Sequence, residues 1–374
     1  MPSEHARLSA SASHRWMNCP PSALLCEAVP DETSDYAKEG TCAHSLCEFK
    51  LRRALGQQAA DPTEDLDFFS SEMDECSDEY VAFIIEALEE ERKAGRNPLV
   101  LIEQRLDFSS YVPEGFGTGD ALIITDGRLH IIDFKYGKGV LVEAQENSQM
   151  MLYALGACEM LGSLYEIDEI TMTIFQPRLG NISSWSMTNS ELYSWANLTL
   201  APAAKMAING EGELKAGPWC RFCKVKASCR KRAEESMALA SYEFREPPIL
   251  TDEEIAIILA KIDELVSWAD DVRQFALSEA LKGKRIDGFK LVEGRSIRRY
   301  SDEAKAAEAV SLAGFDPYER SVKGITAMTA LLGKARFNEM LGALVVKPQG
   351  KPTLVPEADK RPEMTINDFN DTEE

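Results

Sequence analysis

The chain has 374 residues, of which 44% are hydrophobic and 28% charged, a composition typical of a globular protein with one or two domains. Its formal net charge of -21 argues against a protein that coats nucleic acid non-specifically, although it leaves room for a local basic groove. The apolar runs are far shorter than the roughly 20 residues of a membrane span, so we expect no membrane association.

The N-terminus lacks the pattern of a signal peptide. Nine cysteines in a chain without an export signal indicate thiols or metal ligands in a reducing compartment rather than disulfides. We therefore expect a cytoplasmic protein.

The first part of the chain predicts helices and an acidic loop. Residues 9–21 read as a short helix that serines open and Cys19-Pro20 closes, and Cys19 there is either a ligand or a small buried hydrophobe. A second helix over 40–55 places His44 and Glu48 on one face, usually a surface pair. The acidic residues 61–79 predict a solvated insertion, followed by a helix over 80–92.

The next segments predict a strand and then a hairpin. In the strand over 99–103, we assign Glu103 to the sheet edge, with a further site carboxylate as the alternative. The apolar run 121–125 followed by Asp126-Gly127 is a strong hairpin signal. Asp120 should therefore start one strand and Asp133 end the next, antiparallel one, near the same rim.

Lys135 shares a strand face with Asp133, because the two residues are two apart. Two carboxylates suit a hard divalent cation, and Lys135 is placed to meet an anion bound to that cation. The alternative is a structural Asp–Lys pair at a strand end.

The segment after the hairpin predicts a helix over 143–161, strands over 169–175 and 183–187, and a helix over 191–208 broken near Pro202. The cysteine spacing that follows is a strong ligand signal: Cys220, Cys223 and Cys229 form C-x2-C-x5-C. Because no cysteine lies downstream, the fourth ligand must come from upstream, with Cys19 first and Cys26 next. The alternative is a set of reduced structural cysteines.

The C-terminal part predicts a long amphipathic helix over 251–281, with a capping box at Thr251 and Glu254 and its apolar stripe facing inward. A basic hairpin over 285–300 and helices over about 302–312 and 325–344 should follow. We expect a helical and hairpin extension over 241–346 and a flexible tail over 347–374.

Four features stand in one order along the chain: His44 on a helix, Asp120 after a glycine, Asp133-Phe134-Lys135, and Gln149 with Tyr153. This order resembles the RecB-type branch of the PD-(D/E)XK nucleases. A leading Cys19 and three later cysteines are similar to the iron–sulfur members of that branch, such as the AddB nuclease and the CRISPR adaptation nucleases. The resemblance covers about residues 9–232, and the rest resembles an uncharacterised phage and prophage family.

The resemblance implies an α/β, restriction-endonuclease-like core over residues 1–240, with a mixed central sheet flanked by helices and a mainly helical C-terminal extension. It implies a metal-dependent deoxyribonuclease, an exonuclease, in phage DNA recombination or repair. DNA would be its substrate, and a phage single-strand annealing recombinase or single-strand-binding protein its partner.

The resemblance also implies roles for individual residues. His44, Asp120 and Asp133 would hold Mg²⁺ or Mn²⁺, Lys135 would orient water or stabilise charge on the phosphate, and Gln149 and Tyr153 would position the lysine or the DNA. The four cysteines would bind a structural [4Fe–4S] cluster; they are Cys19, Cys220, Cys223 and Cys229.

Two other functions fit the same residues. One is a non-catalytic DNA-binding recombination accessory protein, and the other is a zinc-dependent interaction protein. For a nuclease of this net charge, we expect the basic residues in 224–232 and 285–299 to line the rim of a DNA groove.

Overall fold

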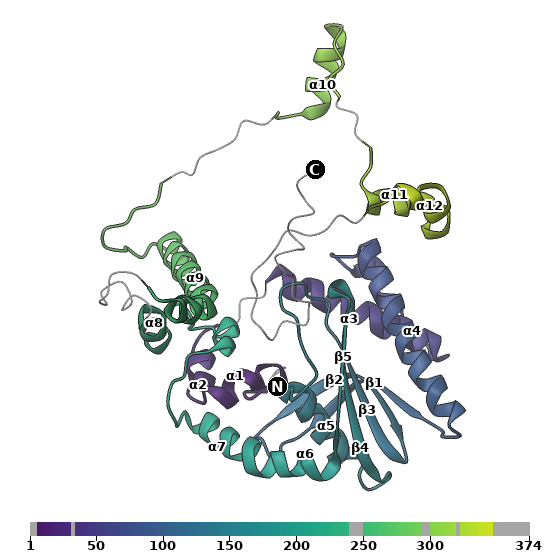
Figure 1. Cartoon of the computed structure of the whole chain (residues 1–374), viewed down its shortest axis with the longest axis vertical. Helices are drawn as coiled ribbons and strands as arrows, with labels where there is room; N and C mark the ends of the chain where they lie inside the picture. Colours follow the sequence, from purple (N-terminus) through teal and green to yellow (C-terminus); the bar gives the residue numbers. More distant parts are fainter. Residues whose placement is uncertain (1–5, 31–33, 239–249, 293–299, 319–321, 347–374) are drawn as a thin grey trace. The chain divides into compact units, whose positions relative to one another are not determined.

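The computed structural model of the chain describes residues 6–30, 34–238, 250–292, 300–318 and 322–346 (Figure 1). The chain divides into two compact units, residues 1–279 and 280–374, and each is described by itself. The domain boundaries expected from the sequence, after residues 240 and 346, stay predictions.

A mixed five-stranded sheet forms the centre of the first unit, in the order β1-β2-β3-β4-β5. The strands are β1 (Leu99–Asp107), β2 (Phe116–Thr125), β3 (Gly127–Phe134), β4 (Ile167–Gln176) and β5 (Asn181–Thr188). Neighbours run antiparallel except β3 and β4, whose parallel pairing needs a crossover. Helix α5 (Ser148–Leu161) lies in that crossover. The expected α/β class with a mixed central sheet is confirmed.

Helices cover both faces of the sheet (Figure 1). Side chains of α5 form one core cluster with residues of α1 (Ser13–Asn18), α2 (Ser22–Glu27), α6 (Asn189–Trp195) and α7 (Ala201–Asn209). Side chains of α3 (Asp35–Ala54) and α4 (Ser71–Lys93) form a second cluster against the other face. The sheet is therefore a shared middle layer, and its edge is reached by helices from both sides.

The predicted acidic loop over 61–79 is wrong from residue 71 onward, because α4 begins there. The Ser70 side chain caps this helix by accepting from Met73 N at 3.2 Å. Met73, Cys76 and Tyr80 are buried at helical spacing, so one apolar stripe packs against the core while the acidic residues lie on the outer face.

Helices α8 (Arg230–Met237) and α9 (Asp252–Leu281) complete the first unit. The predicted capping box of α9 is confirmed, since Thr251 N donates to Glu254 Oε2 at 3.1 Å and Glu254 N donates to Thr251 Oγ1 at 3.3 Å. The prediction that the apolar stripe of α9 faces inward is wrong. Four residues of that stripe are exposed: Ile255, Leu259, Ile262 and Val266. Polar contacts, such as the Arg232–Asp271 ion pair, hold α9 against α8 instead.

The described part of the second unit is helical, with α10 (Glu303–Leu312), α11 (Ile325–Leu332) and α12 (Lys334–Leu341). The two predicted helices are thus confirmed, the second with a break at Gly333, whose φ is 75°. Within 285–292, the described part of the predicted basic hairpin, there is no strand. Arg295, Arg298, Arg299 and the predicted tail lie outside the described residues. Within the described ranges, no helix is long and apolar enough to cross a membrane.

We predict that Gly156→Ala destabilises the protein by about 1–3 kcal/mol, because an added Cβ overpacks the contact between α5 and β1. That Cβ would lie 2.9 Å from Leu106 Cβ and 3.2 Å from a backbone carbon. The change in the urea unfolding midpoint measures this effect.

The matched control is Gly40→Ala in α3, where an added Cβ meets nothing within 4 Å. Since alanine favours a helix over glycine by about 0.5–1 kcal/mol, this variant should be neutral or more stable. Equal midpoint shifts for the two variants would contradict the packing of α5 on β1.

Candidate metal centre and adjoining groove

Three carboxylates lie side by side across β1, β2 and β3. The register places Asp120 opposite Asp133, because Ala121 pairs with Ile132. It also places Asp120 opposite Glu103, because the flanking pairs are Ile102 with Ala121 and Gln104 with Gly119. Asp120 is therefore within β2, not at its start as the sequence predicted.

The β1–β2 ladder is interrupted at Glu103, whose φ of 48° lies in the left-handed region. This conformation costs a non-glycine residue about 1–3 kcal/mol, and like charges on opposing strands repel. Strain and repulsion at one point are typical of a functional position rather than of a stabilising one.

His44 reaches the carboxylates from α3. Its Nδ1 lies 3.4 Å from Asp120 Oδ1, and its ring packs edge-on against Phe134. One ligand atom from each of His44, Glu103 and Asp120 lies within 4.8 Å of the other two. An imidazole nitrogen with carboxylate oxygens is a donor set for a divalent cation. The structure thus brings together two predicted ligands and adds Glu103, which the sequence analysis had assigned to the sheet edge.

Asp133 adjoins this group and connects it to the lysine. Its side chain is 4% exposed, and its Oδ2 lies 2.9 Å from Lys135 Nζ. Apart from the Lys135 ammonium, no hydrogen-bond donor among the described residues reaches that buried oxygen. A carboxylate oxygen has two lone pairs, so one remains for a cation beside the ammonium.

Gln149 and Tyr153 complete the network from α5. Lys135 Nζ donates to Gln149 Oε1 at 3.2 Å, and Gln149 Nε2 donates to Tyr153 Oη at 2.9 Å and to Asp133 Oδ1 at 3.5 Å. The structure therefore brings these four predicted residues into one connected group.

Two local features fix this helix face. Asn147 caps α5 by accepting from Gln149 N at 3.1 Å, which sets where the helix starts. Gly117 allows Tyr153 to approach β2, since a Cβ there would lie 2.7 Å from Tyr153 Cε1. The glycine that precedes Asp120 by three residues thus has a packing role.

The charges at the site shift one another's pKa values. Burial, together with the Asp120 carboxylate, raises the pKa of Glu103 to about 7. Burial lowers the pKa of His44, but the carboxylates of Asp120 and Asp133 outweigh it and raise that pKa to about 9. Burial raises the pKa of Asp133, against the opposing effect of Lys135. Excess acidic groups in one confined place favour the binding of a cation.

The four predicted cluster ligands line one small cavity in the first unit. Cys19 follows α1, Cys220 lies in a 3₁₀ turn (Pro218–Phe222), Cys223 follows that turn, and Cys229 precedes α8. Among the described residues, no three sulfur atoms lie within 4.8 Å of one another.

A fifth thiol lies beside this set. Cys26 Sγ is 3.6 Å from Cys223 Sγ, and their hydrogen bond lowers the pKa of Cys26 to about 6. Cys26 lines the adjoining groove rather than the cavity that the other four share. Cys19 shares the cavity of the other three predicted ligands, whereas Cys26 has a sulfur contact with one of them, so both remain candidates for the fourth ligand.

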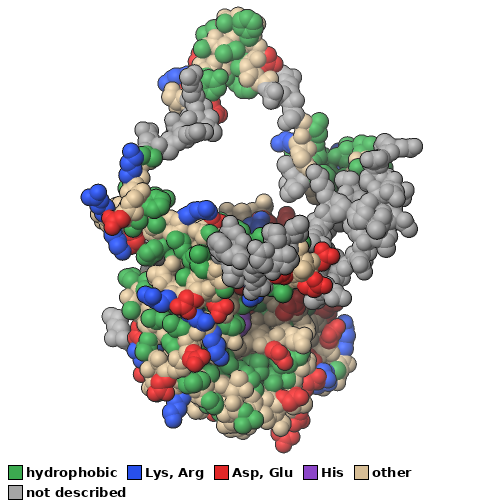
Figure 2. Space-filling view, turned by 60° about the vertical axis from the view of Figure 1, so that its left-hand side comes forward, with side chains coloured by type: hydrophobic (Ala, Val, Ile, Leu, Met, Phe, Trp, Pro, Cys, Tyr) green, Lys and Arg blue, Asp and Glu red, His purple; other side chains and the backbone are tan. Residues whose placement is uncertain are grey.

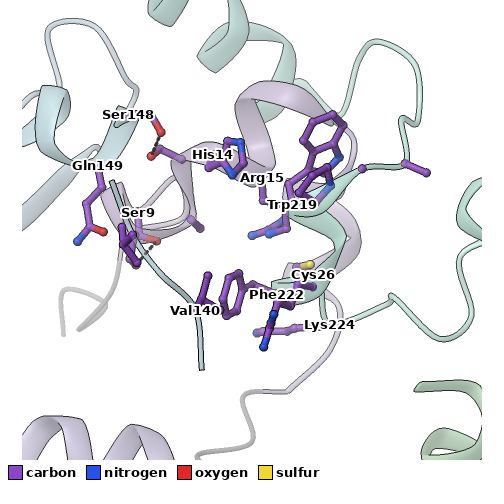
Figure 3. Close-up of a pocket in the computed structure, with 18 of the residues that line it drawn as sticks. Ser9, His14, Arg15, Cys26, Val140, Ser148, Gln149, Trp219, Phe222 and Lys224 are labelled. Atoms are coloured by element: carbon purple, nitrogen blue, oxygen red, sulfur yellow. Dashed lines mark hydrogen bonds between the residues drawn. The ribbon is translucent and has the colours of Figure 1, made fainter. Parts of the chain in front are cut away.

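A groove of about 1870 Å³ adjoins the candidate metal centre. Lys135 and Gln149 line one part of it, and Arg15, Phe222 and Lys224 line another (Figure 3). Pockets for small molecules are usually about 300–1,000 Å³, so this groove suits a larger ligand.

The predicted basic rim is testable only over 224–232, because 285–292 belongs to the second unit and 293–299 lies outside the described residues. Lys224 and Arg232 line the groove. However, Asp271 pairs with both Lys226 and Arg232, at 2.7 and 2.6 Å. Acidic and basic side chains are mixed over the face of the first unit in Figure 2. This face of the first unit therefore offers local cations rather than a broad positive field.

We predict that Mn²⁺ binding strengthens as the pH rises from 6 towards 9 and releases protons. His44 must lose its proton to bind a metal, and its pKa is raised from the ordinary 6.5 to about 9. In the metal-free protein, the same shift contributes stability below pH 6.5 that is lost as the pH rises through about 9. Calorimetric titration with Mn²⁺ in two buffers of different ionisation enthalpy measures both affinity and proton release.

The control is His44→Gln, which should bind Mn²⁺ more weakly and with a flatter pH dependence. Identical proton release in the variant and the wild-type protein would show that His44 is not a ligand.

Comparisons with known proteins identify a family. A solved structure described as "Crystal structure of SSO0001" matches 59% of this chain and 96% of its own, at 12% identity and a TM-score of 0.21. A likeness of that size carries no argument about the site. The family model described as "Protein of unknown function (DUF2800)" matches residues 5–362. The chain therefore belongs to the DUF2800 family.

Proposed function

We propose that this protein is a metal-dependent DNA nuclease, an exonuclease that hydrolyses phosphodiester bonds. The observation that carries the proposal is the joint arrangement of side chains across β1, β2 and β3. A lysine that contacts Asp133 and Gln149 lies beside a row of three carboxylates and a histidine. Lys135 and Gln149 also line a groove large enough for a polymer.

The donor set fits Mg²⁺ or Mn²⁺. His44, Glu103 and Asp120 offer converging ligand atoms, and Asp133 offers a buried oxygen that the Lys135 ammonium contacts. A divalent cation held there supplies a Lewis acid that polarises a phosphodiester and acidifies water.

The remaining residues act on the substrate or on one another. Lys135 carries a positive charge because the carboxylates of Asp133 and Asp120 outweigh burial and raise its pKa. That charge stabilises negative charge developing on a phosphate, or orients the attacking water. Gln149 holds Lys135 through its carbonyl and Tyr153 through its amide, so it positions the lysine rather than reacting itself.

The cysteine set has a structural role in this proposal. A [4Fe–4S] cluster on Cys19, Cys220, Cys223 and Cys229 joins α1 to a segment about 200 residues later. It thereby fixes one wall of the groove. A phage recombination setting, with a single-strand annealing recombinase or single-strand-binding protein as partner, is part of the same proposal.

We predict that Asp133→Ala, Lys135→Ala and Glu103→Gln each lower DNA cleavage by about 100- to 1,000-fold or more, because each removes a metal ligand or the charge that meets the phosphate. The assay is digestion of end-labelled linear DNA and of circular DNA, with Mg²⁺ or Mn²⁺. An exonuclease degrades the linear substrate only.

The matched control is Asp168→Asn, an exposed carboxylate on β4, which should cut at the wild-type rate. Full activity in Asp133→Ala would contradict the nuclease proposal. DNA binding without cutting by the wild-type protein would favour the accessory function instead.

We predict that serine at Cys19, Cys220, Cys223 or Cys229 removes iron and the broad absorbance near about 400 nm, and lowers stability, because a cluster ligand is lost. Cys158→Ser, at a cysteine buried in the α5 core, should keep both iron and colour. Iron content and visible spectra of anaerobically purified protein measure the effect. Zinc in place of iron in the wild-type protein would contradict the cluster assignment.

A further inference from the structure

The wall of the groove formed by the cysteine segment carries an exposed aromatic ring. Phe222 lies between the predicted ligands Cys220 and Cys223 and is 72% exposed. Figure 3 shows it next to Val140, with Lys224 near it and Gln149 further along the same groove. A large apolar ring displayed to solvent within a polar groove is not explained by packing.

The neighbouring Trp219, in contrast, is fixed. Its Nε1 donates to Lys215 O at 2.9 Å, its ring packs edge-on against His14, and it fills the space over Gly217. Phe222 therefore extends from a segment that these contacts hold in place. Less conformational entropy is then lost when a ligand binds to the phenylalanine ring.

A hydrogen bond ties this segment to the active-site loop. Arg221 Nη2 donates to Gly139 O at 3.2 Å, and Gly139 follows Lys135 by four residues along the chain. This hydrogen bond therefore fixes the segment that carries Phe222 relative to the loop after β3, which begins at Lys135.

Two guanidinium groups in the groove are oriented by hydrogen bonds to uncharged acceptors. Arg221 donates to the Gly139 carbonyl, and Arg15 Nη1 donates to Ser22 O at 2.7 Å and to Ser22 Oγ at 2.9 Å. These acceptors are uncharged, so both cations are available to attract phosphate.

We propose that Phe222, with Arg15 and Arg221, forms a subsite for an unpaired DNA strand, in which a nucleobase stacks on the phenylalanine and the arginines contact the backbone. Aromatic rings beside cations are the elements that bind single strands without sequence preference. A duplex cannot use the ring, because its base faces are already stacked. The inference rests on the proposed nuclease function for its choice of DNA, and it adds that the substrate strand is single-stranded beside the cysteine segment.

The test measures binding of a short labelled oligothymidylate in EDTA, where no cleavage takes place. Phe222→Ala should weaken binding about 5- to 150-fold, the range for loss of one base–aromatic stack. Phe222→Trp should restore it, and blunt duplex binding should not change. Phe69→Ala, at an exposed phenylalanine outside the groove lining, is the matched control and should bind as wild type. Unchanged single-strand affinity in Phe222→Ala, or an equal loss on duplex, would overturn the subsite.

A second measurement uses the wild-type protein and so does not depend on how the variant folds. Ultraviolet cross-linking of an oligonucleotide containing 5-iodouracil, followed by peptide mapping, should label Phe222. Cross-links confined to other segments would overturn the proposal. Because neither measurement needs cutting, a protein that binds through Phe222 but never cleaves would refute the nuclease and leave the subsite. A protein that cleaves DNA but is not cross-linked at Phe222 would refute the subsite and leave the nuclease proposal standing.

Discussion

Asp120 has a carboxylate on each side of it in the sheet, Glu103 on β1 and Asp133 on β3. Such a row is repulsive and is largely removed from water, so it needs compensating positive charge. His44 supplies part of that charge from α3, and Lys135 supplies another part from the end of β3. The site destabilises the fold locally, and the two hydrophobic cores on either face of the sheet offset that cost.

The same arrangement explains why the sheet needs helices on both faces. Helix α3 brings the histidine, and α5 brings the glutamine and tyrosine that hold the lysine. The hydrogen bond from Arg221 to Gly139 then links the loop after β3 to the cysteine segment. The candidate metal centre, the groove and the cysteine cavity thus lie next to one another in the first unit.

The sequence was sufficient where the local pattern determines the structure. The Asp126-Gly127 turn, the alternating strands and the Thr251 capping box follow from neighbouring residues, and so does the shared face of Asp133 and Lys135. The acidic stretch 61–79 misled because its charge obscured a stripe with one apolar residue per helical turn at Met73, Cys76 and Tyr80. For α9 the error was the reverse: its apolar stripe predicted burial, but the stripe is exposed. Amphipathic spacing shows that a helix has an apolar face, but it does not specify what that face packs against.

The place of Glu103 at the candidate site could not be predicted from the sequence. Its position in an apolar strand marked it as unusual, but its role depends on the register between β1 and β2, which the chain between them does not determine. Its left-handed φ is a tertiary effect with no local signal. The cysteine spacing, by contrast, predicted a group of three cysteines, and the fold brings them and Cys19 to the same cavity; their role as ligands stays a prediction.

The central claim is that the row of carboxylates and His44 hold a divalent cation for phosphodiester hydrolysis. Anomalous diffraction from crystals soaked in Mn²⁺ tests it most directly. The account predicts a strong peak between His44 Nδ1 and the carboxylates of Glu103 and Asp120, within reach of Asp133 Oδ2. Absence of a peak at that position in crystals soaked in saturating Mn²⁺ would contradict it.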